Sequence, residues 1–262
     1  MELATKGTEP RRVTLPAAAH RFELLTLPDY TALILFDQPK NRAIVWTLQA
    51  DSLCTNWHGS PLVQLFHWWS SAHPLQVLHA GCVGTTDGAV LIVGKGGSGK
   101  STTALLSLEY GLQYVSDDYT LVGSEPAPTA YCLFSTGKLP RDHFPRFPEL
   151  ARIAEDPCLD PFEKPVIFAH EHFAPQISLS LPLKAILLPC ITDQAHTDHT
   201  AMSGVDTLRA MAPSTLLQLQ SSPQHELRAM VALTKKIPGF RLNLSRNFYK
   251  IAPAVSQLLN TL

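Results

Sequence analysis

Apolar and polar residues alternate over the first part of the chain in the way that predicts short strands. Three strand-like runs cover residues 22–25, 31–36 and 42–47, and turn residues separate them at 28–29 and 37–41. Such runs joined by short turns predict a small antiparallel sheet. Residues 1–19 mix Thr, Gly, Pro and Arg, which predicts a loosely attached start.

Helical spacing follows this sheet, after Ser60-Pro61, and proline suits the first turn of a helix. The recurring apolar positions are Leu62, Leu65, Phe66 and Trp69. We expect an amphipathic helix that packs against the core and is broken by Pro74, with Trp68 partly exposed. The alternative role for the aromatic cluster at 66–69 is a peptide-binding or dimer surface.

From residue 76 onward, strands and helices alternate. A strand at 76–82, a turn at 85–88 and an apolar run at 89–93 predict a hairpin. Further strands are expected at 112–116, 119–122, 130–134, 183–188 (ended by Pro189) and 240–244, and helices from Lys100, Ser203, Pro213 and Pro253. The proline-dense stretch 140–165 predicts helix and loop around an entrance, where a mobile flap would fit. The predicted fold class is α/β, with a small β-rich subdomain plus helix at 1–75 and a larger domain at 76–262.

The strongest chemical signal comes directly after the apolar run 89–93. The sequence GKGGSGKS at 94–101 meets every fixed position of the Walker A phosphate loop, and it lies between a strand and a helix. Glycines let backbone N–H groups turn inward around phosphate oxygens, and the helix N-terminus adds partial positive charge there. Lys100 would reach the β- and γ-phosphates, and the Ser101 hydroxyl would be a ligand of Mg²⁺. The expected nucleotide contacts are Gly94, Gly96, Gly97, Ser98, Gly99, Lys100, Ser101 and Thr102.

Two adjacent acids, Asp117 and Asp118, form the second part of this signal. A helix from Lys100 to about Tyr110 carries the chain roughly 15 Å from the phosphates, and Gly111 is suited to end it. The strand at 112–116 returns about 16 Å, so the acids should arrive beside a bound triphosphate. One acid can then hold the metal while the other accepts a proton from an attacking hydroxyl. Alone, the pair would indicate only a turn.

In this chain the acids follow the strand directly after the loop helix, and a histidine, His79, lies upstream of the loop. In this arrangement the chain resembles the HPr kinase/phosphorylase family and the related phosphoenolpyruvate carboxykinases. The resemblance covers mainly residues 77–122, and it is greatest to the short HPr kinase-like proteins encoded with peptide-modification systems. These include kinases of the C-terminal Ser of lasso-peptide precursors. The implied fold is a P-loop kinase core of the HPr kinase C-terminal-domain type, with a mixed sheet flanked by helices.

The resemblance also implies roles for single residues. Asp117 would be the general base, Asp118 would serve Mg²⁺, and His79 would line the phosphate pocket, with ATP as the phosphoryl donor. The chain has no counterpart of the family's second glycine-containing signature or of its phosphorylase-associated Arg/Lys loop. This favours a kinase without phosphorylase activity and an acceptor other than HPr. The missing N-K-x-D motif leaves GTP without support.

Composition limits the partners. With 21 Lys+Arg against 22 Asp+Glu the net charge is −1, so no basic footprint for nucleic acid is present. Charged residues make up 16% of the chain, a low share that suggests self-association as a homo-oligomer. Five scattered cysteines, no apolar leader and no long apolar run predict a cytoplasmic chain with reduced thiols that does not enter a membrane.

Several alternatives stay open at this stage. Besides a serine kinase acting on a protein or peptide, the pattern allows a small-molecule kinase, a nucleotide-dependent regulatory module or carboxykinase chemistry. Lys138 and Arg141, then Arg241 and Arg246, are candidates for extra positive charge near the γ-phosphate. The histidine pairs at 170–172 and 196–199 invite a metal interpretation, but neither has the spacing of a known zinc motif.

Overall fold

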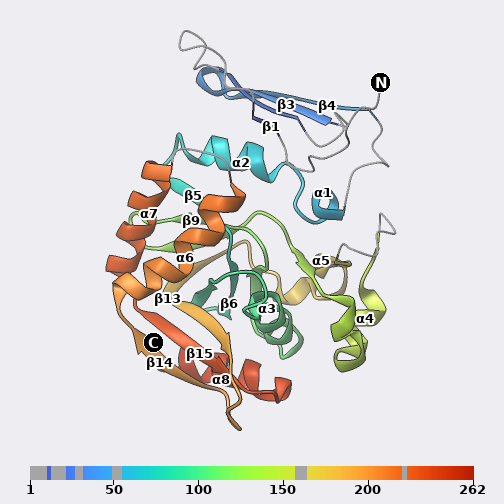
Figure 1. Ribbon diagram of the computed structural model, residues 1–262, viewed down its shortest axis with the longest axis vertical. Helices are drawn as coiled ribbons and strands as arrows, with labels where there is room; N and C mark the ends of the chain where they lie inside the picture. The colour runs from blue at the N-terminus through green and yellow to red at the C-terminus, as the bar shows by residue number, and fades with distance from the viewer. Residues whose placement is uncertain (1–10, 13–21, 27–31, 49–54, 157–163, 220–222) are drawn as a thin grey trace, which may run out of the picture.

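The computed structural model describes residues 11–12, 22–26, 32–48, 55–156, 164–219 and 223–262. Figure 1 shows a small N-terminal sheet above a larger α/β body, with α1 and α2 between the two. In the part of the chain that the structure describes, no helix has the length and apolarity to cross a lipid bilayer. The predicted mixed α/β architecture with a β-rich N-terminal part is confirmed.

The larger body is built on one mixed sheet. Seven of its strands follow the order β5-β9-β10-β13-β7-β6-β8, and β15 extends from β13 with β14 beside it. The strands are β5 (Leu75–Leu78), β6 (Gly81–Thr85), β7 (Gly88–Ile92), β8 (Gln113–Ser116), β9 (Thr120–Gly123), β10 (Thr129–Cys132), β13 (Ser180–Ile191), β14 (Asp198–Met202) and β15 (Gly239–Leu244). A separate two-stranded sheet joins β11 (Thr136–Lys138) to β12 (Val166–Phe168).

Strand direction in this sheet brings four carboxyl ends to one edge. β6 is antiparallel to β7 on one side and to β8 on the other, so β7 and β8 run the same way. β13 is parallel to β7 and to β15. The segments that follow β7, β8, β13 and β15 therefore emerge together, at the edge where open α/β sheets bind ligands.

Helices cover both faces of the sheet. Helices α3 (Lys100–Glu109) and α8 (Ile251–Leu259) pack on one face, in a core that includes Val90 and Ile92 of β7. Helices α6 (Gly204–Gln218) and α7 (Pro223–Lys236) pack on the other, in a core with Ala89 and Leu91. Successive residues of β7 thus enter opposite cores, which explains why this strand reads as an unbroken apolar run.

Helix α2 (Val63–Ser70) is shared between the two parts of the molecule. The N-terminal sheet has the order β1 (Arg11–Arg12), β2 (Phe22–Thr26), β3 (Ala32–Asp37) and β4 (Arg42–Thr47), as the three strand-like runs predicted. Trp68 packs on Ile34 and Phe36 of β3, while Phe66 contacts the cluster around Val77. The expected exposure of Trp68 was wrong: it is 3% exposed, because a second sheet covers the face that a single core would leave open.

Tertiary pairing also revises several predicted elements. The strand expected at 76–82 is two strands, because β5 pairs with β9 and β6 pairs with β7, and the chain turns between them at His79-Ala80. Pro189 does not end β13: the pairing with β7 stops at Leu187, so the residue without an N–H lies where only β15 is a neighbour. The two helices expected from Ser203 and Pro213 are one helix, α6, with Pro213 inside it.

The remaining described elements are short helices and 3₁₀ turns. They are α1 (Thr55–Gly59), α4 (Pro148–Ile153), α5 (Ala169–His172) and the 3₁₀ turns η3 (Gln38–Lys40), η5 (Arg141–Arg146), η6 (Ala174–Gln176) and η7 (Phe248–Lys250). Cys82, Cys132 and Cys190 are free thiols, and Cys54 and Cys158 lie outside the described residues. Most of the predicted loop at 1–19 and part of the predicted flap, 157–163, also lie outside them.

The double packing of α2 predicts that Trp68 stabilises the whole molecule. Trp68→Ala should cost about 3–5 kcal/mol of unfolding free energy, as removal of a buried aromatic side chain does. Trp46→Ala is the matched control, because Trp46 is 51% exposed, and it should change stability by less than about 0.5 kcal/mol. Urea denaturation of both variants measures the difference, and equal losses would contradict the shared core.

Candidate active site

The phosphate loop has the backbone that its sequence requires. Gly94, Gly97 and Gly99 have φ values of 136°, 76° and 103°, in the region that residues with a Cβ atom avoid. A Cβ at Gly99 would lie 2.6 Å from the Leu244 side chain, so this position also needs glycine for close packing on β15. The turned shape of the loop therefore depends on its glycines, and α3 begins directly after it.

Lys100 is folded back over the loop. Its Nζ donates to the carbonyl oxygens of Gly94 at 2.9 Å and Lys95 at 3.4 Å, and the residue is 7% exposed. Burial lowers the pKa of Lys100 from its ordinary value, and the charges of Asp118 and Asp117 oppose this shift. The ammonium group thus lies against the backbone at the start of the loop.

The two acids arrive at the same edge, at the carboxyl end of β8. Asp117 is 1% exposed, and its Oδ2 accepts a hydrogen bond from the Lys138 backbone N–H at 3.0 Å. Asp118 has a side chain that is 24% exposed. Its Oδ1 is 3.1 Å from Nε2 of His79, and its Oδ2 accepts from Nζ of Lys138 at 2.7 Å. Lys138 thereby contacts both acids, one through its backbone and the other through its side chain.

The surroundings drive the pKa values of the two acids apart. Burial, and then the neighbouring charge of Asp118, raise the pKa of Asp117 to about 6, although the Lys138 N–H and the Ser101 hydroxyl favour its ionised form. Burial acts in the same direction on Asp118, but the His79 hydrogen bond and the Lys138 charge outweigh it. They hold the pKa of Asp118 well below its usual range. One acid can exchange a proton near neutral pH while the other stays ionised.

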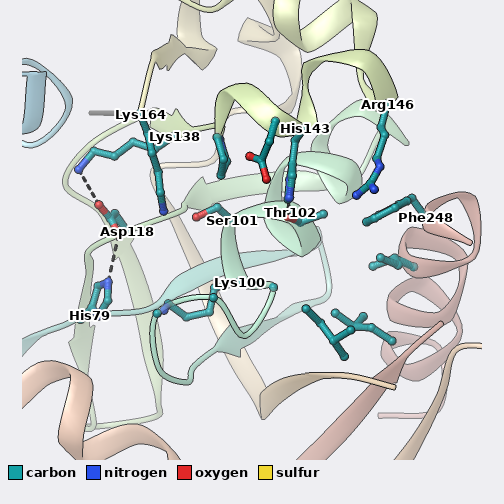
Figure 2. Close-up of a pocket in the computed structure, with 18 of the residues that line it drawn as sticks. His79, Lys100, Ser101, Thr102, Asp118, Lys138, His143, Arg146, Lys164 and Phe248 are labelled. Carbon is teal, nitrogen blue, oxygen red and sulfur yellow. Dashed lines mark hydrogen bonds and ion pairs between the residues drawn. The ribbon is translucent and has the colours of Figure 1, made fainter. Parts of the chain in front are cut away.

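A cavity of about 1360 Å³ connects these groups. Figure 2 shows His79, Asp118 and Lys138 on one side of Lys100, and His143, Arg146 and Phe248 on the other. The predicted residues that line the cavity are His79, Gly96, Gly97, Gly99, Lys100, Ser101, Thr102, Asp118, Lys138 and Arg246. Asp117, Gly94 and Ser98 lie behind this lining, with Asp117 interacting with Ser101.

Not every predicted cation reaches the cavity. Arg141 forms an ion pair with Asp156, and neither Arg141 nor Arg241 lines the cavity. Arg246 lines it but forms a largely exposed ion pair with Asp193 at 2.7 Å. The histidine pairs lie elsewhere, at α5 and at β14, and among the described residues no three His, Cys, Asp or Glu side chains are grouped to hold a metal.

The structure adds lining residues that the sequence analysis missed. Lys164, near the end of the predicted flap stretch 140–165, lines the cavity, and its charge acts on Lys100. His143 lies 3.5 Å from the Thr102 hydroxyl, and Phe248 follows β15 at the ligand-binding edge. Lys164 and His143 belong to the stretch 140–165 that the sequence placed around an entrance, whereas no signal in the sequence pointed to Phe248.

The donor set fits both a nucleotide and Mg²⁺. The positive-φ glycines and the N-terminus of α3 form the cradle that phosphate oxygens need. The Ser101 hydroxyl and two carboxylates are hard oxygen ligands of the kind that Mg²⁺ prefers. Oδ1 of Asp117 is buried with no hydrogen-bond partner among the described residues, as an oxygen reserved for a ligand would be.

Comparisons with known proteins found similar solved structures but no similar sequence. No protein-family model matches the chain, and no curated protein matches it. A solved structure of the Hpr(Ser) kinase/phosphatase from Coxiella burnetii is similar to it, with a TM-score of 0.40 and 12% sequence identity. The alignment covers 71% of this chain and 95% of that one.

Proposed function

We propose that this protein is a kinase that transfers the γ-phosphoryl group of ATP to a serine hydroxyl of a protein or peptide. The observation that carries the proposal is the meeting of a phosphate loop and a pair of acids at one cavity, which Asp118 lines and Asp117 adjoins through its contact with Ser101. A phosphate loop alone binds nucleotide, whereas acids beside the terminal phosphate supply what transfer to a hydroxyl needs: a metal ligand and a proton acceptor.

Binding of the triphosphate would fall to the loop and its lysine. Backbone N–H groups of the glycine loop would bind the phosphates, and Lys100, whose Nζ donates to Gly94 and Lys95, would bind phosphate oxygens in their place. Ser101 and Asp118 would hold Mg²⁺, which neutralises charge on the phosphate oxygens when it is bound. Lys138 and Lys164 add positive charge on the same side of the cavity.

The acids divide the remaining tasks by their pKa values. Asp117, with a pKa of about 6, is matched to accept a hydroxyl proton near neutral pH, while the ionised Asp118 suits the metal. His79 holds Asp118 from the side away from Lys138 and so fixes the direction of its carboxylate. Asp117 also contacts Ser101, the other proposed Mg²⁺ ligand, so the metal dependence of each variant tests which acid holds the metal.

The acceptor is the least constrained part of the proposal. Ser60, Val63, Tyr119 and Gln218 line the cavity on the side of His79, and they are uncharged. An uncharged wall suits a peptide or a small alcohol better than a strongly charged substrate. A precursor peptide that ends in Ser, as lasso-peptide kinases use, is the specific acceptor we propose, and a small-molecule alcohol is the rival.

Phosphate transfer tests the proposal directly. Incubation with Mg²⁺, ATP and precursor peptides ending in Ser should add one phosphate, seen by mass spectrometry. Lys100→Ala should lose ATP binding and transfer, whereas Lys235→Ala, at an exposed position of α7, should keep both. ATP binding without transfer to any peptide or alcohol would contradict the kinase and favour a regulatory module.

Variants of the two acids then separate their roles. Asp117→Asn should bind Mg²⁺ and ATP about as tightly as the unmodified protein but lose at least about 100-fold in transfer rate, as loss of a general base does. Asp118→Asn should need a higher Mg²⁺ concentration for ATP binding, because it removes a metal ligand. Calorimetric titration of ATP at several Mg²⁺ concentrations measures this. The reverse pattern would show that the roles are exchanged.

The pKa of Asp117 predicts how transfer depends on pH. The protonated acid cannot accept the hydroxyl proton, so kcat/KM should be level above pH 7 and fall about tenfold per pH unit well below pH 6. The profile should be measured between pH 5 and 8 at constant ionic strength, with phosphate incorporation as the readout. A rate that stays level down to pH 5 would remove Asp117 from the role of base.

A further inference from the structure

One end of the cavity has a different chemical character from the rest. We call it the Phe248 end, and it consists of Arg146, Ile191, Leu244 and Phe248. Ile191 is 70% exposed although it is a large apolar side chain, and Leu244 lies beneath the surface at 3%. Neither phosphates nor a metal would use apolar side chains. These side chains suit a part of a ligand that is itself flat or apolar.

The position of the acids tells which way a bound nucleotide must point. Asp117 and Asp118 mark the place of the terminal phosphate, because a metal ligand and a proton acceptor act there. Figure 2 shows Asp118 and Phe248 on opposite sides of Lys100, with Ser101 and Thr102 between them. A chain of phosphates that has its γ-phosphate at the acids therefore leads past Thr102 toward the Phe248 end. The nucleoside must leave the loop in that direction.

The Phe248 end carries side chains of the kinds that bind aromatic bases. The Arg146 guanidinium carbon lies 5.2 Å from the centre of the Phe248 ring, in a cation–π contact. Phe147 supports the ring edge-to-face at 5.3 Å, so Phe248 is held in place from inside the protein. Rigid aromatic rings and planar guanidinium groups are the side chains on which bases stack. His143 connects this cluster to the loop helix through Thr102.

We infer that the Phe248 end is the nucleobase site, where the base of the bound nucleotide lies against the Phe248–Arg146 pair with Ile191 and Leu244 as its apolar walls. The inference rests on the proposed function, since it assumes a nucleotide in the loop. It assigns the two ends of the cavity: the base at Phe248, and the acceptor hydroxyl at His79 and Asp118.

The test compares ATP with a probe that has phosphates but no nucleoside. Calorimetry should be run with Mg²⁺–ATP and with Mg²⁺–tripolyphosphate on Phe248→Ala, Phe248→Trp and Arg146→Ala. Loss of the ring should weaken ATP binding about tenfold, within the range for removal of a base-stacking side chain. Phe248→Trp should stay within about twofold, because it keeps an aromatic face. Tripolyphosphate affinity should be unchanged in all three variants.

Tyr249→Ala provides the matched control. Tyr249 is the next residue in the chain, is 84% exposed and does not line the cavity, so both ligands should bind to this variant unchanged. The inference is overturned if Phe248→Ala binds ATP as tightly as the unmodified protein. It is also overturned if ATP and tripolyphosphate weaken together, which would mean that Phe248 only shapes the loop. Failure of the unmodified protein to bind either ligand would instead reject the proposed function itself.

Discussion

The antiparallel strand β6 determines where the chemistry of this protein can occur. Because it pairs with β7 on one side and with β8 on the other, it points both neighbours in the same direction. The phosphate loop after β7 and the acids after β8 therefore meet at one edge of the sheet. Reversal of either pairing would carry one group to the far edge, a strand length away. The loop, its lysine and the acid pair form one site only because these three strands pair in this order.

Burial and neighbouring charges separate the pKa values of the two acids at this edge. Asp117 is nearly excluded from water next to a second carboxylate, so its ionised form is penalised, whereas Asp118 is compensated by Lys138 and His79. Lys138 holds both acids at once, through its backbone N–H and its ammonium group. The short strand β11 thus helps to set the protonation states of both acids through Lys138.

Other segments that end at this edge of the sheet supply the remaining walls of the cavity. β13 and β15 end beside the loop and bring Ile191 and Leu244 to one side of it, while the break between β5 and β6 brings His79 to the other. Helix α2 contributes Val63 to the His79 side and packs its opposite face on the N-terminal sheet. The N-terminal part of the chain is therefore joined to the wall of the cavity through a packed helix.

Local patterns in the sequence determined the turns, the helix and the strand lengths around the phosphate loop. The glycines of the phosphate loop, the helix after it, the stop at Gly111 with φ of 100° and the return of the chain to Asp117 all follow from residue type and element length. Tertiary structure alone decided which strands pair, and with that the break at His79, the continuation of β13 through Pro189, the burial of Trp68 and the arrival of Phe248 in the cavity. The physical reason is that the hydrophobic period of an element and its capping residues are local features of the sequence. The partners of an element are selected by burial and hydrogen bonding between segments far apart in the chain, so the sequence of one segment does not identify its partner.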